Sequence, residues 1–222
     1  MRGFWVRVPV VPLQILLNFL LALLEIKVHT TCPMITPTSI TNYNRTEEEL
    51  EEFLMFAILV AGKGAEMQAK KLDEFLKRSM WEQIGKPFAH LEFLIKNNWL
   101  EIHMKEFKLG QYKRIGNAFK EILKFKGRLK SVTIEELESV PGIGSKTARF
   151  FILHSRPNQR VAVLDTHILK YLKNMGHNVP KATPTKIKYK AIEQLFIQIA
   201  DSMKMSIADL DLHIWKTYAQ KA

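Results

Sequence analysis

Apolar residues recur every three or four positions through most of this chain, as they do along the buried face of an α-helix. No segment shows sustained alternation of apolar and polar residues, which is the pattern of a half-buried strand. Helices are expected over residues 46–62, 66–78, 88–97, 113–126, 134–140, 166–175, 185–202 and 207–220, with one more starting near residue 145. The pattern therefore predicts an all-α protein.

Two of the expected helices carry a start signal. Thr46 is followed three residues later by Glu49, and Thr133 is followed by Glu136. At this spacing the threonine hydroxyl accepts a bond from the glutamate N–H, while the glutamate side chain accepts one from the threonine N–H; this is a capping box. We therefore expect helices to begin directly after Thr46 and Thr133.

The first 33 residues differ from the rest of the chain. Two arginines precede an apolar stretch over 8–24, which is typical of a signal-peptide core or of a marginal membrane helix. A simpler interpretation is that translation starts at Met34 and that residues 1–33 are upstream reading frame. We expect residues 1–33 to lie outside the fold and residues 34–222 to form it.

A surplus of positive charge indicates the class of partner. The 222 residues include 33 Lys and Arg against 22 Asp and Glu, which leaves a net charge of +11. Such a protein is attracted to a polyanion. Ten of the basic residues fall within 96–130, against three glutamates. A charge run is most often a solvated helix face. We expect this one to face DNA, because it comes shortly before the glycine-rich segment 140–147, whose backbone can bind phosphate.

The number and spacing of the cysteine and histidine residues argue against several kinds of metal site and against a disulfide. One cysteine, Cys32, cannot supply the thiolates of an iron–sulfur cluster or a cysteine-based zinc finger, nor can it form an intramolecular disulfide. The seven histidines include neither an HxxxH nor an HxH pair, so a dedicated transition-metal site is not expected. We therefore expect no metal and no other cofactor.

The segment Val-Pro-Gly-Ile-Gly-Ser-Lys-Thr over 140–147 carries the clearest functional signal. Its glycines let the backbone turn tightly and expose N–H groups, and a helix that begins near residue 145 aims its positive end at the same place. Together these features form an anion-binding site for a DNA phosphate. The candidate DNA-binding residues are Gly142, Ile143, Gly144, Ser145 and Thr147. A plain tight turn between two helices is the alternative.

This motif, with Leu137 before it and Val-Leu-Asp-Thr-His-Ile over 163–168 after it, resembles the helix-hairpin-helix, Gly/Pro-rich, Asp superfamily of DNA glycosylases. Endonuclease III and the 8-oxoguanine glycosylases belong to that superfamily. The resemblance implies a two-lobed all-α fold with a DNA cleft between the lobes. The implied parts are a central lobe over 49–135, the helix-hairpin-helix over 133–154, and a second lobe from 34–48 and 157–222.

The resemblance also implies that Lys146 is the nucleophile and Asp165 the essential carboxylate. The lysine amine would attack C1′ of an extruded nucleotide, expel the base and form a Schiff base. Asp165 would stabilise the developing oxocarbenium charge or accept the amine's proton. The alternatives are a phosphate-binding lysine and an N-cap for the helix that begins at Thr166. Lys146 and Asp165 are 19 positions apart, 165 − 146, and this separation favours the catalytic roles because it suits the superfamily.

Two further parts of the resemblance indicate DNA contacts. Lys63 lies between two glycines, where the superfamily has a loop that enters the duplex; a helix C-cap is the alternative for this turn. The run Gly-Gln-Tyr-Lys-Arg over 110–114 is similar to a Gly-x-Tyr-x-x-Lys/Arg element, with Ile115 at the final position. The candidates from this run are Tyr112, Lys113 and Arg114.

Two candidates lie further along the chain. His167, two positions after Asp165, is expected to contact DNA. Trp215, in the run Asp-Leu-His-Ile-Trp over 211–215 that is similar to a stretch of endonuclease III, is expected to line the base pocket. A tryptophan at helical spacing with Leu212 is also typical of a core.

Together these features predict a base-excision-repair DNA glycosylase with AP lyase activity on double-stranded DNA that contains an oxidised base. The lack of a four-cysteine cluster favours 8-oxoguanine, with the oxidised pyrimidines of an endonuclease III-like enzyme as the alternative. A non-enzymatic helix-hairpin-helix DNA-binding protein is the third hypothesis. Such a protein has no need of a buried carboxylate at position 165 near DNA, because a carboxylate repels phosphate. We expect a monomer that acts inside the cell with DNA and not with a membrane.

Overall fold

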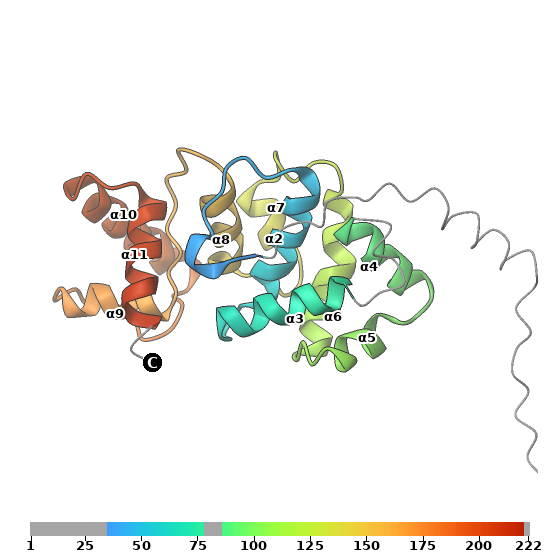
Figure 1. The fold of residues 1–222 in the computed structure, drawn as a ribbon. Helices are drawn as coiled ribbons and strands as arrows, with labels where there is room; N and C mark the ends of the chain where they lie inside the picture. Colours follow the sequence, from blue (N-terminus) through green and yellow to red (C-terminus); the bar gives the residue numbers. More distant parts are fainter. Residues whose placement is uncertain (1–34, 78–85, 220–222) are drawn as a thin grey trace, which may run out of the picture. The chain divides into compact units, whose positions relative to one another are not determined.

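The computed structural model describes residues 35–77 and 86–219 (Figure 1). The hydrophobic segment over 1–33 and the expected start at Met34 lie outside these residues. The described elements are helices, so the all-α prediction is confirmed. They are η1 (Pro37–Ser39), α2 (Glu47–Leu59), α3 (Ala65–Lys77), α4 (Pro87–Lys96), α5 (Leu100–Glu106), α6 (Tyr112–Ile122), η2 (Leu123–Phe125), α7 (Ile134–Glu138), α8 (Ser145–Ser155), α9 (Thr166–Asn174), α10 (Lys186–Ser202) and α11 (Ile207–Ala219).

Both expected capping boxes are confirmed. The N–H of Glu49 donates to the Thr46 hydroxyl at 3.2 Å, and the Thr46 N–H donates to the Glu49 carboxylate at 2.8 Å. Thr133 and Glu136 make the same two bonds at 3.1 and 2.8 Å at the start of α7. Each pair satisfies two N–H groups that the first turn of a helix leaves without intrahelical partners.

The sequence pattern predicts no helix over 100–106, where the structure has α5. Only three residues separate α5 from α4, and the break contains neither Gly nor Pro. Asn98 makes the break by adopting a left-handed conformation with φ 59°, which asparagine tolerates better than most residues. The buried residues of α5 are Leu100 and Met104, one turn apart, which is too short a pattern to identify a helix.

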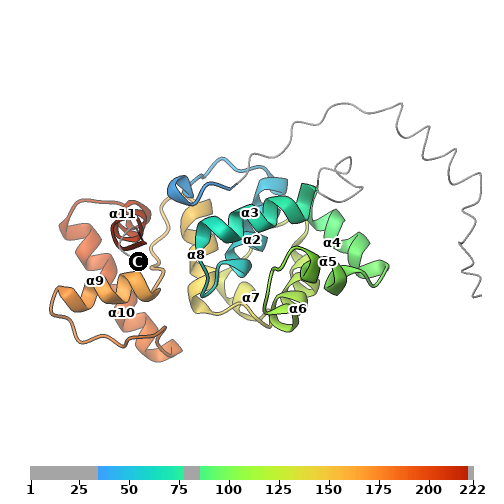
Figure 2. The ribbon, with the colours of Figure 1, turned by 60° about the horizontal axis from the view of Figure 1, so that its bottom comes forward.

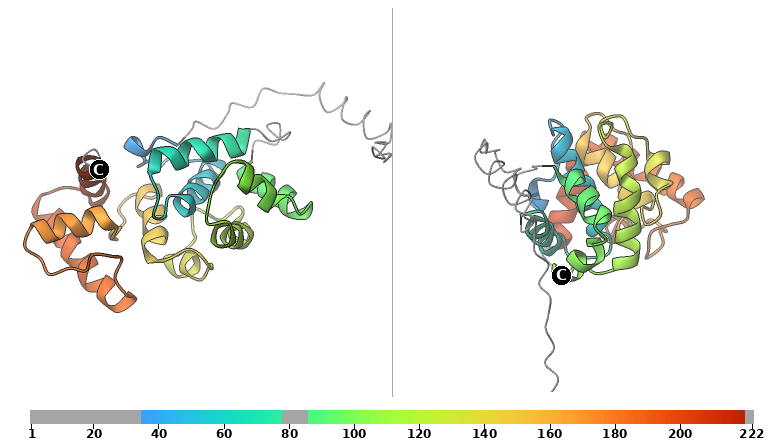
Figure 3. Two further views of the ribbon diagram at one scale, coloured as in Figure 1. Left: turned by 90° about the horizontal axis from the view of Figure 1, so that it is seen from below. Right: turned by 90° about the vertical axis from the view of Figure 1, so that its right-hand side faces the viewer.

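The buried apolar side chains form two clusters. The first runs from Ile35 to Ile152 and includes α2, whose residues are buried continuously from Leu50 to Leu59. The second runs from Leu153 to Ile214 and joins α9, α10 and α11, which Figures 2 and 3 show grouped on one side of α8. The second half of α2, residues 53–59, is apolar all round, as expected of a helix at the centre of a core, and α2 packs against α3, α4, α6 and α8.

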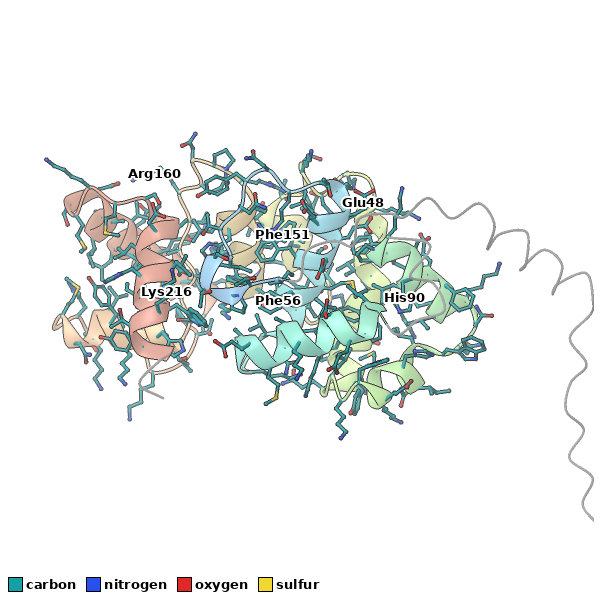
Figure 4. All side chains as sticks on the ribbon, viewed as in Figure 1. Glu48, Phe56, His90, Phe151, Arg160 and Lys216 are labelled. Carbon is teal, nitrogen blue, oxygen red and sulfur yellow. The ribbon has the colours of Figure 1, made fainter. Side chains whose placement is uncertain are left out.

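α8 lies where the two clusters meet. Phe53 of α2 stacks on Phe151 of α8 with 5.5 Å between the ring centroids, and Phe56 lies 6.3 Å from Phe150. Figure 4 labels Phe56 in α2 and Phe151 in α8. Phe150 packs against the second cluster as well as the first. The helix that carries Lys146 is therefore held from both sides.

The lobe boundaries expected from the sequence stay a prediction, because a cluster of buried side chains is not by itself a lobe. Ile35 and Ile40 come from the segment that the sequence assigns to the second lobe, and both are buried in the first cluster. Arg45, in the same segment, donates to the carbonyl oxygen of His154 at the end of α8. The segment before α2 thus contacts α8 as well as the first cluster.

Glu51 is a buried carboxyl group in α2. Its side chain accepts a hydrogen bond of 2.9 Å from the N–H of Phe88 at the start of α4, and the residue is 4% exposed. Burial raises the pKa of Glu51 to about 7, with a further rise from Glu48 and Glu47 that the Phe88 bond opposes. Because the folded protein binds this proton more tightly than the unfolded chain does, the contribution to stability is complete below pH 4.5 and is lost as the pH rises through 7.

Replacing Glu51 with Gln tests this assignment, because glutamine keeps an oxygen for the Phe88 N–H but carries no charge. From pH 5 to pH 8, the free energy of unfolding of the unchanged protein should fall by about 2–3 kcal/mol more than that of Glu51→Gln. Urea unfolding of both proteins at the two pH values measures the difference. An equal change in both proteins would show that Glu51 does not titrate in this range.

Candidate active site

The hairpin between α7 and α8 is shaped by Gly142 and tied down by Arg114. Gly142 has a φ of 98°, a left-handed conformation that favours glycine. A Cβ at this position would lie 3.0 Å from both Cγ and the carbonyl oxygen of Arg114. The Arg114 guanidinium donates to the carbonyl oxygens of Gly142 and of Ile58 in α2, each at 2.9 Å. Arg114, a predicted DNA contact, thus fixes the hairpin against the first cluster.

α8 begins directly after the hairpin, with Gly144 as its N-cap residue. Its first intrahelical bond runs from the N–H of Ala148 to the Gly144 carbonyl oxygen, which leaves the preceding N–H groups of Ser145, Lys146 and Thr147 for an outside acceptor. Ile143, a predicted DNA contact, is 4% exposed and packs in the first cluster, so only its backbone is available. This geometry suits a phosphate.

Lys146 lies in the first turn of α8 and lines a pocket of about 450 Å³, part of it open to solvent. Two other predicted site residues, Asp165 and Trp215, line the same pocket although they are far away in the sequence. The remaining lining is mostly apolar and comes from Pro37, Ile40, Phe56, Val60, Ala65, Phe150, Val163, Asp211 and Leu212. The Lys146 amine lies 5.6 Å from the centroid of the Phe150 ring.

Asp165 is the N-cap residue of α9 and also faces the pocket. Its Oδ1 accepts hydrogen bonds from the N–H groups of His167 and Ile168, both at 2.9 Å. Among the described residues, no hydrogen bond reaches its second oxygen. The capping role and the catalytic role considered from the sequence are therefore compatible, because the cap orients the carboxylate through one oxygen only.

Asp211 is a pocket residue that the sequence prediction does not include. It is 7% exposed, and its carboxylate lies 3.1 Å from Nε2 of the fully buried His154, whose Nδ1 lies 2.8 Å from the Thr41 hydroxyl. Burial raises the pKa of Asp211, as does the charge of Asp165, while His154 and Lys146 oppose the rise. The sequence does contain a signal for this residue: Asp211 precedes Trp215, a predicted pocket residue, by one helical turn, and so lies on the same face of α11.

The other predicted DNA contacts are not among the residues that line this pocket. The Lys63 amine donates to the carbonyl oxygen of Leu109, and its pKa is lowered by burial and by the charges of Arg114 and Lys71. Tyr112 and Lys113 line a separate polar hollow that α5 and α6 form. His167 follows the pocket residue Asp165 in the first turn of α9 and is half-buried.

The basic run over 96–130 is partly neutralised within the protein. Four of its side chains are paired with carboxylates: Lys105 with Glu101 at 2.7 Å, Lys124 with Glu121 at 3.6 Å, Lys126 with Glu92 at 2.7 Å and Arg128 with Glu136 at 2.7 Å. Exposed pairs of this kind add little to stability. They do reduce the net positive charge that the run presents to a polyanion.

Two kinds of feature are absent from residues 35–77 and 86–219. No group of three His, Cys, Asp or Glu side chains within these ranges is placed to hold a metal ion. None of the helices described there combines the length and the apolar character that crossing a membrane requires.

A tight hairpin before a helix, and a lysine in the first turn of that helix that shares an apolar pocket with an aspartate, agree with the class of helix-hairpin-helix DNA glycosylases that the sequence motif indicates. A family model described as 8-oxoguanine DNA glycosylase matches residues 38–205. The chain therefore belongs to the 8-oxoguanine DNA glycosylase family, and the family assignment made from the sequence is confirmed.

Individual relatives agree with the family model. The chain is similar to the 8-oxoguanine DNA glycosylase/AP lyase of Methanocaldococcus jannaschii, with 29% identity over 181 residues, covering 78% of this chain and 81% of the relative. An enzyme of the same description from Thermoplasma volcanium is 32% identical over 180 residues, with coverage of 77% and 80%.

Solved structures support the fold. The Methanocaldococcus jannaschii glycosylase/lyase in complex with a 15mer DNA containing 8-oxoguanine superposes with a TM-score of 0.61 and 24% identity, over 83% of this chain and 87% of that one. The 8-oxoguanine DNA glycosylase of Thermotoga maritima gives a TM-score of 0.59 at 22% identity, over 81% and 85%. At this identity the comparison confirms the fold alone.

Gly142→Ala tests the geometry of the hairpin. Alanine would hold a strained φ and push against Arg114, so the free energy of unfolding should fall by about 1–3 kcal/mol. Gly144→Ala is the matched control, because Gly144 has a φ of −97° and no atom lies within 4 Å of the place that an alanine methyl group would take. Urea unfolding compares the two. Equal losses in both variants would contradict the strain assigned to Gly142.

Proposed function

We propose that this protein removes 8-oxoguanine from double-stranded DNA and then cleaves the abasic site through a Schiff base on Lys146. The observation that carries the proposal is that Lys146 and Asp165 line one apolar pocket beside the N-terminal end of α8. The family match and the names of the curated relatives support both the glycosylase and the lyase activity.

The pocket supports recognition of an extruded base. An enzyme cannot reach C1′ of a stacked nucleotide, so it must extrude the nucleotide and recover the unstacking energy from new contacts. Phe150 and Trp215, which are both partly exposed, offer aromatic surface to a planar base. The hairpin N–H groups and the first turn of α8 would hold a neighbouring phosphate, so that backbone and base are bound side by side.

The reaction then uses two polar residues of the pocket lining, Lys146 and Asp165. The neutral Lys146 amine attacks C1′ and forms a C–N bond, and the bond from C1′ to the base breaks, with its electron pair leaving on the base. Asp165 stabilises the positive charge that develops on the sugar and takes the proton from the attacking amine. Opening of the sugar ring gives the Schiff base, which acidifies the neighbouring C2′–H and permits β-elimination of the 3′ phosphate.

Double-stranded DNA with an oxidised base is the proposed partner, and we propose that the protein acts as a monomer wherever the cell keeps its DNA. The net charge of +11 supports this partner, because a polyanion attracts a basic protein over long distances. The hairpin supports it locally, through backbone groups that bind phosphate irrespective of sequence.

Replacing Lys146 with Gln tests the covalent step. Borohydride should trap the unchanged protein on duplexes with 8-oxoguanine or an abasic site, and Lys146→Gln should abolish trapping while duplex binding stays measurable. Lys173→Gln, which removes an exposed lysine from α9, is the control and should be trapped normally.

A third duplex with thymine glycol distinguishes the substrates. Trapping on thymine glycol but not on 8-oxoguanine would indicate an oxidised-pyrimidine enzyme. Trapping that survives Lys146→Gln would assign the amine elsewhere, and no trapping on any duplex by the unchanged protein would favour a non-enzymatic DNA-binding protein.

Asp165→Asn separates the catalytic role from the capping role, because asparagine is as good an N-cap residue as aspartate. If the carboxylate serves the transition state, the rate of base release should fall by roughly two to four orders of magnitude. The stability of α9 should be nearly unchanged, and the affinity for DNA should stay level or rise because a negative charge is lost. Single-turnover rates, urea unfolding and duplex binding measure these three quantities. A normal rate would leave Asp165 with the cap alone.

A further inference from the structure

The chain that delivers Asp165 to the pocket includes a buried segment over residues 162–164, between α8 and α9. Ala162, Val163 and Leu164 are each at most 2% exposed, yet they lie in neither a helix nor a strand. A buried backbone in this state needs partners for its N–H and C=O groups, because an unpaired group is costly. The carbonyl oxygen of Val163 accepts from the N–H of Asp165 at 2.7 Å, and side chains of α10 bond both backbone groups of Ala162 and the N–H of Leu164.

One hydroxyl group of α10 holds two of these backbone groups. The Tyr189 hydroxyl donates to the carbonyl oxygen of Ala162 at 2.8 Å and accepts from the N–H of Leu164 at 3.0 Å. Tyr189 is 1% exposed, and burial raises the pKa of its hydroxyl, so the proton that it donates stays in place. Leu164 directly precedes Asp165, and so this hydroxyl fixes the backbone next to the carboxylate.

An ionic cluster connects the same segment to the helix of the nucleophile. Arg149 lies in α8, three residues after Lys146, and its Nε donates to the Glu193 carboxylate at 2.8 Å. The same Glu193 oxygen accepts from the N–H of Ala162 at 2.9 Å. The Arg149 guanidinium also lies 4.5 Å from the centroid of the Tyr189 ring. One arginine thus contacts both α10 side chains that hold the buried segment over 162–164.

A second carboxylate holds this arginine from the side of the hairpin. Nη1 of Arg149 donates to Glu138 at the end of α7, at 2.8 Å. The side chains of Arg149, Glu138 and Glu193 are 11%, 13% and 9% exposed, so the cluster is shielded from water. Buried ion pairs contribute little net stability, because desolvation offsets their attraction, but their directional bonds define one arrangement of the groups they join.

We propose that Tyr189, Glu193 and Arg149 are positioning residues that set the place of the Asp165 carboxylate relative to the Lys146 amine. None of the three is among the pocket-lining residues, so they act through the backbone of residues 162–164 and through α8. The inference rests on the proposed catalytic role of Asp165. A displacement of about 1 Å at a reacting group can cost roughly 10²-fold in rate, so a tether of this kind matters for catalysis.

Tyr189→Phe tests the tether, because phenylalanine fills the same space and removes only the hydroxyl. The single-turnover rate of 8-oxoguanine release should fall by about 10- to 100-fold, while duplex affinity should stay within about twofold. Arg160→Ala is the matched control. It removes an exposed ion pair of 2.8 Å with Asp201, two residues before the buried segment over 162–164, and should leave the rate unchanged (Figure 4).

A double-mutant cycle shows whether Tyr189 acts through Asp165. In an Asp165→Asn background, Tyr189→Phe should slow the residual reaction by less than about threefold, because the carboxylate that the hydroxyl positions is already gone. Rates are measured at a temperature where unfolding curves show every variant to be folded. An equal loss of rate in both backgrounds, or a loss of stability with a normal rate, would overturn the positioning role. A normal rate for Asp165→Asn alone would instead overturn the catalytic role proposed for Asp165, on which this inference rests.

Discussion

α8 lies between the two hydrophobic clusters, and its side chains are divided between them. Phe151 stacks on a ring of α2 in the first cluster, while Leu153 belongs to the second and Phe150 contacts both. Because the helix is held from two sides, its first turn has a defined place and direction. The Lys146 side chain of that turn therefore lines the pocket, and the first N–H groups of α8 lie beside the hairpin.

The Asp165 carboxylate, which lines the pocket together with Lys146, is held in place by other contacts than those that hold α8. Asp165 is oriented by the helix that it caps, and the segment before it is held by α10 through Tyr189 and Glu193. A residue at a helix N-cap has little rotational freedom, since its side chain is bonded to the next turn. Local capping and tertiary tethering thus act on the same group, which is what a preorganised acid–base site requires.

Much of this organisation can be predicted from local sequence signals. The capping boxes, most helices and the Gly/Pro motif depend on residues a few positions apart, so the sequence shows them directly. The rest depends on contacts between distant residues: Tyr189 bonds a segment 25 positions away, and Arg114 bonds a carbonyl 28 positions away. Asp211 and its histidine partner are 57 positions apart. Buried polar pairs of this kind follow no periodicity, and only the folded structure brings them together.

The central claim is that the amine of Lys146 carries the reaction from within this pocket. Its most direct test is to reduce the complex with an 8-oxoguanine duplex by borohydride, digest it, and map the modified peptide by mass spectrometry. If Lys146 is the nucleophile, the sugar remnant will be attached to Lys146, in a peptide that trypsin fails to cut at that residue. A remnant attached to any other amine of the chain would contradict it.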